Sequence, residues 1–372
     1  MTIKAKGLGF LIVLLCSSAF AQTQSWVTRR ISNNLGYSSR PSIAISGSNV
    51  YITWDDDTLG NTEIFIKSSK NGGATWSLQK NISNNSGESW ASKIVASGAY
   101  LYIIWQDNTL GNSEVFFKRS KDGGLTWSNS KRIASMSGDS QWPSIVAKDK
   151  QVYIVWTDST PGNYEIYFIM SNDAGTSWTP IKRLTNTAGD SWWPEIAIEG
   201  SNIYLVWQDD SSGHFQINFK RSINGGKNWK AATRFTSSSA DSMYPCLAVV
   251  EPFIYAVWGD YIDDQARGIN FKKSSNKGVT WGATSLFDTQ GGDVDIIAKE
   301  SNLYVVWDNS GLIYSRSDDQ GESWTDPIKL TYKVAGRPQI IVDELSKVYI
   351  VYAELISDLQ GNWDIYLKYS KN

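Results

Sequence analysis

The stretch "SKDGGLTW", residues 120–127, decides the fold, because similar octapeptides return along the whole chain. Their common form is Ser-x-Asp/Asn-x-Gly-x-Ser/Thr-Trp. An Asp or Asn side chain can bond backbone groups two residues on, and glycine supplies the positive φ of a tight turn. Each octapeptide is therefore predicted to turn the chain between two strands. The other copies are SKNGGATW (69–76), SNDAGTSW (171–178), SINGGKNW (222–229), SSNKGVTW (274–281) and SDDQGESW (317–324).

Strand-like runs surround each octapeptide. A Tyr-x-x-Trp run such as YITW (51–54) and a second run such as EIFIKSS (63–69) precede the turn. A polar-apolar run such as SLQKNIS (77–83) and a short apolar run such as PSIVA (143–147) follow it. Four short strands in about 50 residues, with turn signals between them, are typical of a propeller blade.

The two ends of the chain decide how many blades there are. YIVY (349–352) and DIYLKYS (364–370) begin a seventh blade, and the chain stops before its fourth strand. Trp26 and the following VTRRIS match the strand that comes after an octapeptide. We therefore predict an all-β, seven-bladed β-propeller of four-stranded blades, a single domain over residues 22–372. The N-terminal strand joins the C-terminal blade and closes the ring, which removes an open sheet edge.

Residues 1–21 have the pattern of an export signal. Two lysines precede the apolar run Leu8–Leu15, and Ala19–Ala21 supplies a small-x-small cleavage site. We expect a signal peptide and a secreted or periplasmic protein, with a lipoprotein anchored at Cys16 as the alternative. No later run approaches the ~20 apolar residues of a membrane helix, so no membrane span is predicted.

Composition excludes several classes of function. The net charge is −2 and no basic block occurs, which argues against nucleic-acid binding. Without Cys16 only Cys246 remains, so no intrachain disulfide can form. His214 is the single histidine, which excludes a multi-histidine metal site, and we predict no metal, no cofactor and a monomer.

Acidic residues recur two positions after the strand tryptophans. Calcium would suit their carboxylates, but the repetition in five blades favours a role in capping the hairpins. These acids are Asp56, Asp107, Asp158, Asp209 and Asp260.

The octapeptides resemble the Asp-box (BNR) repeats of bacterial sialidases and other Asp-box propellers, over essentially the whole predicted mature chain. The resemblance implies that they lie between the third and fourth strands, on the face away from a ligand site. It makes turn residues of Asp122, Asp173 and Asp319, and of Asn71, Asn224 and Asn276 in the same slot.

The catalytic set of sialidases is not recognisable in this chain. Sialidases have six blades, an Arg-Ile-Pro-like motif, an arginine triad, a Tyr/Glu nucleophile pair and an aspartate acid/base. Ser39-Arg40-Pro41 is the nearest approach to the first motif. No catalytic residue is assigned, and a non-catalytic role is favoured over a sialidase-related glycoside hydrolase.

Aromatic residues collect in the loops that lead into the inner strands, on the face opposite the octapeptides. The variable positions of these loops hold Trp90, Trp142, Trp192, Trp193 and Tyr244. The rings could be plugs that pack on one another and seal the channel. They could also be platforms for sugar rings, because aromatic side chains bury much area at little entropic cost. Both interpretations stay open.

The other side of the channel mouth is charged. Arg40 and Arg337 occupy the same aligned position in neighbouring blades, and Asp293 occupies it in blade six. Blade six has the shortest connection between its second and third strands, at 308–311, and the longest one, in blade five, carries Arg267. This lowered rim beside arginines would take a carboxylate through paired hydrogen bonds. In the alternative, the arginines pair with nearby acids and only close the ring.

Together these features predict a secreted propeller that binds a ligand, most simply a glycan or glycoconjugate, on the face opposite the octapeptides. A sialidase-like glycoside hydrolase or polysaccharide lyase is the first alternative. A scaffold for a protein partner is the second.

Overall fold

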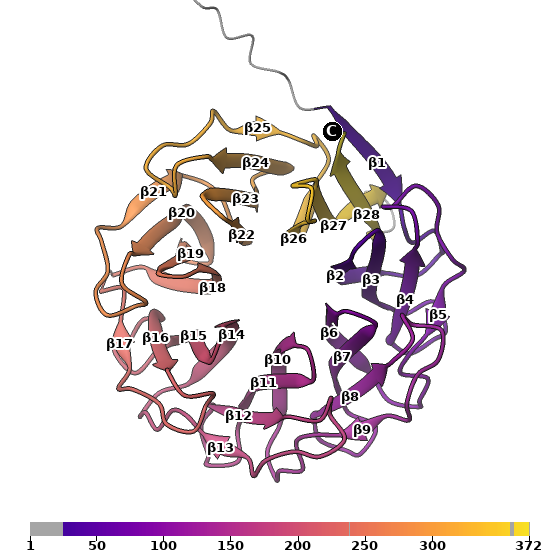
Figure 1. Cartoon of the computed structure of the whole chain (residues 1–372), viewed down its shortest axis with the longest axis horizontal. Coiled ribbons are helices and arrows are strands. Elements are labelled where there is room, and N and C mark those ends of the chain that lie inside the picture. Colours follow the sequence, from indigo (N-terminus) through magenta and orange to yellow (C-terminus); the bar gives the residue numbers. More distant parts are fainter. Residues whose placement is uncertain (1–24, 238, 358–360, 372) are drawn as a thin grey trace, which may run out of the picture.

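The computed structural model describes residues 25–237, 239–357 and 361–371, and the predicted signal segment lies outside them. Seven antiparallel sheets of four strands each form a ring around a central channel (Figure 1), which confirms the predicted all-β, seven-bladed propeller. Among the described residues, no helix is long and apolar enough to cross a membrane.

Each blade runs from an inner strand at the channel to an outer strand at the circumference. The first three blades are β2 (Ser38–Ser46), β3 (Asn49–Asp56), β4 (Glu63–Ser69), β5 (Lys80–Asn81); β6 (Ser89–Ser97), β7 (Tyr100–Asp107), β8 (Glu114–Ser120), β9 (Lys131–Arg132); and β10 (Ser140–Lys148), β11 (Gln151–Asp158), β12 (Glu165–Ser171), β13 (Lys182–Arg183). The next three are β14 (Ser191–Glu199), β15 (Asn202–Asp209), β16 (Gln216–Ser222), β17 (Thr233–Arg234); β18 (Asp241–Val250), β19 (Phe253–Ile262), β20 (Gln265–Ser274), β21 (Ser285–Asp288); and β22 (Val294–Lys299), β23 (Asn302–Asp308), β24 (Leu312–Ser317), β25 (Ile328–Lys329). Blade seven is β26 (Ala335–Val342), β27 (Val348–Ser357), β28 (Asn362–Ser370) and β1 (Trp26–Arg30).

The ring closes as the sequence predicts. Strand β1 pairs antiparallel with β28, from Trp26 opposite Ser370 to Arg30 opposite Tyr366. Just beyond the strand, the Ser32 hydroxyl donates to Asp364 Oδ1 at 2.7 Å. Figure 1 shows β1 as the outer strand beside β28, so the two ends of the chain share one sheet.

The core is a series of apolar layers between adjacent blades rather than one central core. Each layer combines faces of two neighbouring sheets, as where Trp54 and Phe65 of blade one pack with Val351 and Leu367 of blade seven. The tryptophans of the Tyr-x-x-Trp runs are nearly or fully buried in these layers. Large aromatic rings supply most of the buried area where two twisted sheets face each other.

The octapeptide lies at the turn between the third and fourth strands. In blade two, Asp122 Oδ1 accepts hydrogen bonds from the Ser120 hydroxyl at 2.7 Å and from the Thr126 N–H at 2.9 Å. Gly123 and Gly124 have φ of 68° and 88°, which suits glycine. The Thr126 hydroxyl also donates to Asp122 Oδ2 at 2.5 Å, and this hydrogen bond, with the two above, lowers the pKa of the Asp122 carboxyl to about 2. The carboxylate therefore serves to hold the turn.

The recurring aspartates after the strand tryptophans are caps. Asp107 Oδ2 accepts from the Ser89 hydroxyl at 2.6 Å and from the Trp105 indole N–H at 3.2 Å. Its other oxygen accepts the Thr109 N–H at 2.9 Å. Within the described part of the chain, no cluster of three or more His, Cys, Asp or Glu is placed to hold a metal ion. The geometry therefore agrees with hairpin capping.

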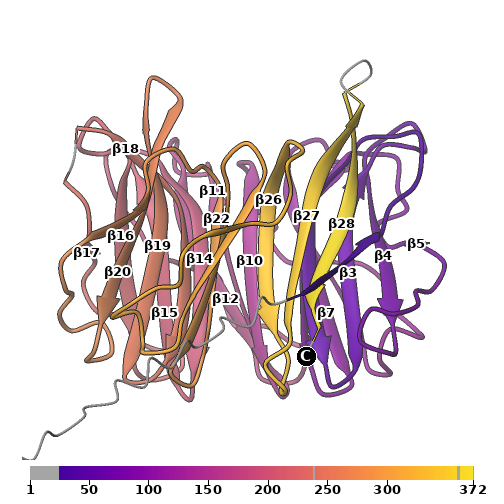
Figure 2. The same cartoon turned by 90° about the horizontal axis from the view of Figure 1, so that it is seen from above.

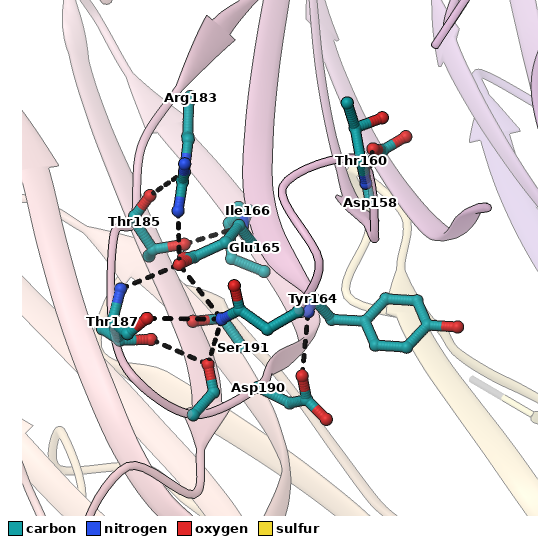
Figure 3. A network of polar contacts seen from close by, with 12 residues as sticks. Asp158, Thr160, Tyr164, Glu165, Ile166, Arg183, Thr185, Thr187, Asp190 and Ser191 are labelled. Carbon is teal, nitrogen blue, oxygen red and sulfur yellow. Dashed lines mark hydrogen bonds and ion pairs between the residues drawn. The ribbon is translucent and has the colours of Figure 1, made fainter. Parts of the chain in front are cut away.

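A buried glutamate at the start of the third strand ties down the loop that leads to the channel mouth (Figure 3). In blade three, Glu165 Oε1 accepts from Arg183 at 2.7 Å and from the Thr187 N–H at 2.8 Å. Asp190 of the same loop accepts the Tyr164 N–H at 2.8 Å. The loop is thus fixed at several points before it enters the inner strand β14.

One oxygen of this glutamate, Oε2, has no partner among the described residues in blades two and three, whereas it has one in blade one. In blade one, the Ser83 hydroxyl donates to Glu63 Oε2 and accepts the Ile64 N–H at 2.8 Å. In blade two the residue at this position is Ala134, and Oε2 of the fully buried Glu114 has no partner among the described residues. Burial raises the pKa of Glu114 although its other oxygen pairs with Arg132.

We expect Ala134→Ser to stabilise the protein, because a serine hydroxyl can donate to the unpartnered Glu114 oxygen as Ser83 does to Glu63. The free energy of unfolding should rise by roughly 1 kcal/mol, the net value of a buried hydrogen bond. Chemical denaturation measures this change. The matched control is Ser83→Ala, which should lose roughly 1–3 kcal/mol by orphaning Glu63. Equal or lower stability of Ala134→Ser would show that blade two satisfies Glu114 in another way.

Candidate functional site

The inner strands bulge where they enter the channel. In six blades the pairing between the inner strand and the next strand slips at one point, and the residue there has a left-handed backbone. These residues are Arg40, Ala91, Trp142, Trp193, Tyr244 and Arg337, with φ between 46° and 55°. A non-glycine residue in this region costs about 1–2 kcal/mol. Bulges re-aim side chains, and here all six line the central cavity.

Side chains from the preceding blade hold the bulges in place. Gln106 accepts the Trp142 N–H at 2.8 Å, and Gln208 accepts the Tyr244 N–H at 2.9 Å. A proline follows the bulge residue in five of the six blades, at 41, 143, 194, 245 and 338. Because proline has no N–H, the bulge leaves no unpaired donor at the next position. The left-handed backbone is therefore stabilised by a hydrogen bond to the bulge residue in blades three and five, and by the proline that follows it in five blades.

The cavity has a volume of about 400 Å³ and is lined by all seven blades. Blade six has no bulge, and Asp293 occupies the corresponding place at the mouth. Of the predicted site residues, Arg40, Trp142, Trp193, Tyr244, Asp293 and Arg337 line this cavity.

The cavity wall does not include the other three predicted residues. Trp90 and Trp192 lie one position before the bulge, so their side chains leave the strand elsewhere. Trp192 packs on Tyr164 with ring centroids 3.9 Å apart. Arg267 is exposed on β20. The bulge thus divides the predicted aromatic arc into a cavity set and a peripheral set.

The cavity aromatics form a continuous stack. The ring centroids of Trp142 and Trp193 are 3.6 Å apart, and the angle between the ring planes is 27°. Tyr244 meets Trp193 edge-on, with ring centroids 5.0 Å apart. Tyr261 continues the row against Tyr244 at 5.7 Å, and the Arg40 guanidinium lies 5.9 Å from the Trp142 ring. Contact between neighbouring rings is what the plug interpretation predicts. The stack covers the mouth on the side of blades three to five.

The two arginines at the mouth differ in their partners. Arg40 forms an ion pair with Asp55 at 2.9 Å. Burial raises the pKa of Asp55 to about 6, although Arg40 and, more weakly, Arg337 lower it. Arg337 is exposed, and no hydrogen bond or ion pair within the described residues engages it. The ring-closing interpretation therefore holds for Arg40, whereas Arg337 keeps its donors available.

Beneath the stack, the next inward-facing position of each blade forms a mostly polar belt. Its members are Ser42, Lys93, Ser144, Glu195, Cys246, Asp295 and Gln339. Lys93 of blade two reaches Glu195 of blade four at 2.8 Å, and Ser144 donates to the same carboxylate at 2.7 Å. This ion pair lies in front of the inner strand of blade three, below the mouth.

Burial in the channel shifts the pKa values of the titratable side chains in the belt. Burial raises the pKa of Asp295 to about 7, although the carboxyl accepts the Ile340 N–H at 2.8 Å. Burial also raises the pKa of the Cys246 thiol well above its ordinary value. Burial alone would lower the pKa of Lys93, but the Glu195 carboxylate outweighs it and the pKa is raised. Lys93 and Glu195 were not identified from the sequence, although they stand two positions after the bulge in the aligned loops.

Blade six places two carboxyl groups beside each other. Burial and the neighbouring Asp293 raise the pKa of Asp308 to about 7, and Asp308 Oδ1 accepts the Gly292 N–H at 3.1 Å. The Asp308 N–H in turn donates to the Asp293 carbonyl at 3.1 Å. A glycosidase needs an acid and a carboxylate on opposite sides of the bond that is cleaved, whereas these two groups lie beside each other in blade six, and of the two Asp293 alone lines the cavity.

Comparison with solved structures shows a propeller fold like that of glycan-active enzymes. The polysaccharide lyase Uly1 superposes with a TM-score of 0.62 at 9% identity, over 95% of this chain and 94% of that one. A protein of unknown function from Dyadobacter fermentans gives 0.59 at 12% identity, over 92% and 99%. A mutant sialidase from Trypanosoma rangeli that displays trans-sialidase activity gives 0.54 at 14%, over 79% and 56%. No protein-family model and no curated protein matches the sequence. At these identities the likeness concerns the fold.

Trp193→Ala should lower stability, because the Trp193 ring contacts both Trp142 and Tyr244. We expect a loss of roughly 2–4 kcal/mol, somewhat below the range for a fully buried tryptophan since this ring is half-buried. Near-ultraviolet circular dichroism should also lose the coupling between the stacked indoles. Trp192→Ala is the control, which should keep the coupling. If Trp193→Ala melts like the unmodified protein, the stack is not a structural plug.

Stability should fall as the pH rises from about 4 to about 7. The folded-state pKa values of Asp295 and Asp308, about 7, lie above the ordinary value of 3.8. Their bound protons therefore favour folding fully below about pH 4, and this contribution is lost as the pH rises through 7. Asp295→Asn should remove part of the slope, roughly 1–4 kcal/mol over this range. Asp122→Asn is the control, because the pKa of Asp122 is about 2. Identical slopes in all three proteins would contradict the assignment.

Proposed function

We propose that this chain is an exported, monomeric Asp-box β-propeller that binds an acidic glycan at the cavity mouth. The observation that carries the proposal is Arg337, an exposed guanidinium without an ion pair among the described residues, at the edge of a cavity of about 400 Å³. A guanidinium presents two parallel N–H groups that match a carboxylate. A polysaccharide lyase and a sialidase are among the proteins with a similar fold, which supports a glycan as the ligand.

The surroundings of Arg337 suit one end of a sugar acid. Burial raises the pKa of Tyr244, Asp293 adds to this effect, and Arg337 opposes it. Both charged groups therefore lie close enough to the Tyr244 hydroxyl to act on it. A sugar ring at this place would meet an aromatic edge, a cation for its carboxylate and the Asp293 carboxylate for a hydroxyl group. Arg40, held by Asp55 and Trp142, would border the same space from blade one.

A glycoside hydrolase or lyase is the second candidate, and Asp308 is the observation that favours it. A carboxyl group that keeps its proton near neutral pH is suited to general acid catalysis. Asp293 and Asp308 lie beside each other rather than on two sides of a substrate, and Glu195, an acid of the cavity wall in blade four, is held in an ion pair with Lys93. This arrangement supports binding over hydrolysis.

Arg337→Ala should weaken binding of trigalacturonate by at least about tenfold, the effect expected for hydrogen bonds to a charged group. Isothermal titration calorimetry at fixed ionic strength measures the affinity. Arg337→Lys should recover only part of it, because lysine cannot form the bidentate pair. Arg267→Ala removes an exposed arginine outside the cavity and is the matched control.

Two results would contradict the proposed function. One is binding of trigalacturonate that is unchanged in Arg337→Ala. The other is turnover, detected with chromogenic glycosides or as ultraviolet absorbance of an unsaturated product, that disappears in Asp308→Asn. The second result would assign the enzymatic candidate instead.

A further inference from the structure

The rim of the cavity has one gap, above blade six. Strand β23 extends one residue beyond its buried Trp307, to Asp308, whereas β19 extends four residues beyond Trp258, to Ile262. Strand β27 extends five residues beyond Tyr352, to Ser357. At about 3.3 Å per residue, the neighbouring strands rise roughly 10 Å above blade six on either side. Figure 2 shows the hairpins of blades five and seven standing above the rest of this face.

The floor of this gap is formed by backbone that lies close to the blade. A Cβ atom added to Gly291 would meet Ile269 at 2.5 Å, and one added to Gly292 would meet Asp308 at 2.6 Å. Larger residues would therefore force the backbone outward at these positions. The loop is pressed against the blade, and the Tyr261 hydroxyl of blade five lies beside it, 3.6 Å from the position of a Cβ on Gly292.

The loop Leu330–Val334 forms the side of the gap toward blade seven. It is fixed at one end to the short hairpin of blade six, since the Leu330 N–H donates to the Leu312 carbonyl at 2.7 Å. It is fixed at the other end to the tall hairpin of blade seven, where the Leu355 N–H donates to the Val334 carbonyl at 3.0 Å. This loop leads from the outer strand β25 to the inner strand β26, and so it runs from the circumference to Arg337.

A highly exposed aromatic ring stands on this loop. Tyr332 is 85% exposed, the most exposed tyrosine of the described residues, and it lies between Thr331, which is bonded to Leu312, and Lys333. The Lys329 ammonium lies 5.5 Å from its ring centroid. Lys333 pairs with Glu354 at 3.2 Å and is itself 60% exposed. An exposed ring with one ammonium beside it, and a second cation on the next residue of the chain, is suited to stack on a sugar and to attract its carboxylates.

The distribution of charge indicates on which side of the gap an acidic chain would lie. The blade-five hairpin turns at Asp263 and Asp264, which would repel an acidic chain. The blade-seven side offers Arg337, then Lys333, then Lys329, in order from the cavity outward. We propose that an acidic glycan chain, with one end in the cavity at Arg337, passes out over blade six and lies along Leu330–Val334, with Tyr332 as an outer stacking platform. This inference rests on the proposed function and adds that the ligand is a polymer with several units bound.

Length dependence tests this path. Oligogalacturonates of three and eight residues would be titrated into the unmodified protein, and the octamer should bind about tenfold more tightly. Tyr332→Ala should weaken octamer binding by about fivefold to tenfold, the worth of an aromatic contact, and change trimer binding by less than about twofold. Because Tyr332 is so exposed, the melting temperature should not change. Leu345→Ala, which removes another highly exposed side chain, is the control.

A second variant closes the gap. Insertion of Thr-Leu-Gly-Asn between Asn309 and Ser310 gives blade six the longer connection found in blade two, and it should remove the octamer's advantage while trimer binding persists. Equal affinities of trimer and octamer, or an octamer indifferent to both variants, would overturn the path while Arg337-dependent trimer binding still supported the proposed function. No binding of either oligomer would overturn both.

Discussion

Ring closure by the pairing of β1 with β28 is the constraint on which the rest of this structure depends. Each apolar layer lies between two neighbouring blades, so a ring of seven blades has seven layers only if blade seven is complete and meets blade one. Strand β1 supplies the outer strand of that blade, and Ile31 packs in the layer that joins the two ends. Because a closed ring has no free blade face, apolar residues at the seam are as buried as anywhere else.

Closure also leaves unpaired backbone groups along the channel, and side chains in the channel satisfy them. Seven inner strands present one edge each to the channel, and the backbone N–H groups on those edges need acceptors. The belt supplies several of them across blades: Ser42 accepts the Ile94 N–H at 3.2 Å, and Gln339 accepts the Ile43 N–H at 3.3 Å. Nearer the mouth, Gln106 and Gln208 accept the N–H groups of two bulge residues in the same way. Many polar side chains in the channel are thus needed to satisfy the backbone, so a ligand site must be sought among polar groups that are not.

The repeat made the fold predictable, and it limited what could be predicted of the site. Octapeptides with a Ser-x-Asp-x-Gly pattern specify a turn by local chemistry alone, and their spacing gives the blades. The bulge is different, since it depends on strand pairing and, in blades three and five, on a glutamine of the preceding blade, neither of which the loop sequence reveals. An ungapped alignment therefore groups Trp192 with Trp193, although only Trp193 lines the cavity. The belt residues Lys93 and Glu195 meet in front of the inner strand of blade three, a contact between blades two and four that no local pattern contains.

Departures from the repeat gather in blade six, and this is the strongest guide to function. Blade six has no bulge, its connection at 309–311 is the shortest, and Asp308 replaces the neutral residues found at this position in most blades. A blade that served only to fill the ring would gain stability from the same bulge, caps and hairpin that the others have. Instead, Asp308 keeps a raised pKa beside Asp293, and the rim falls where Arg337 lacks an ion pair among the described residues. A half-buried carboxyl group forced to keep its proton and a lowered rim are costs to the fold, and a ligand that neutralises Arg337 and fills the gap would offset them. On this physical argument we propose that a ligand binds at the open side of the mouth rather than on the more conspicuous tryptophan stack.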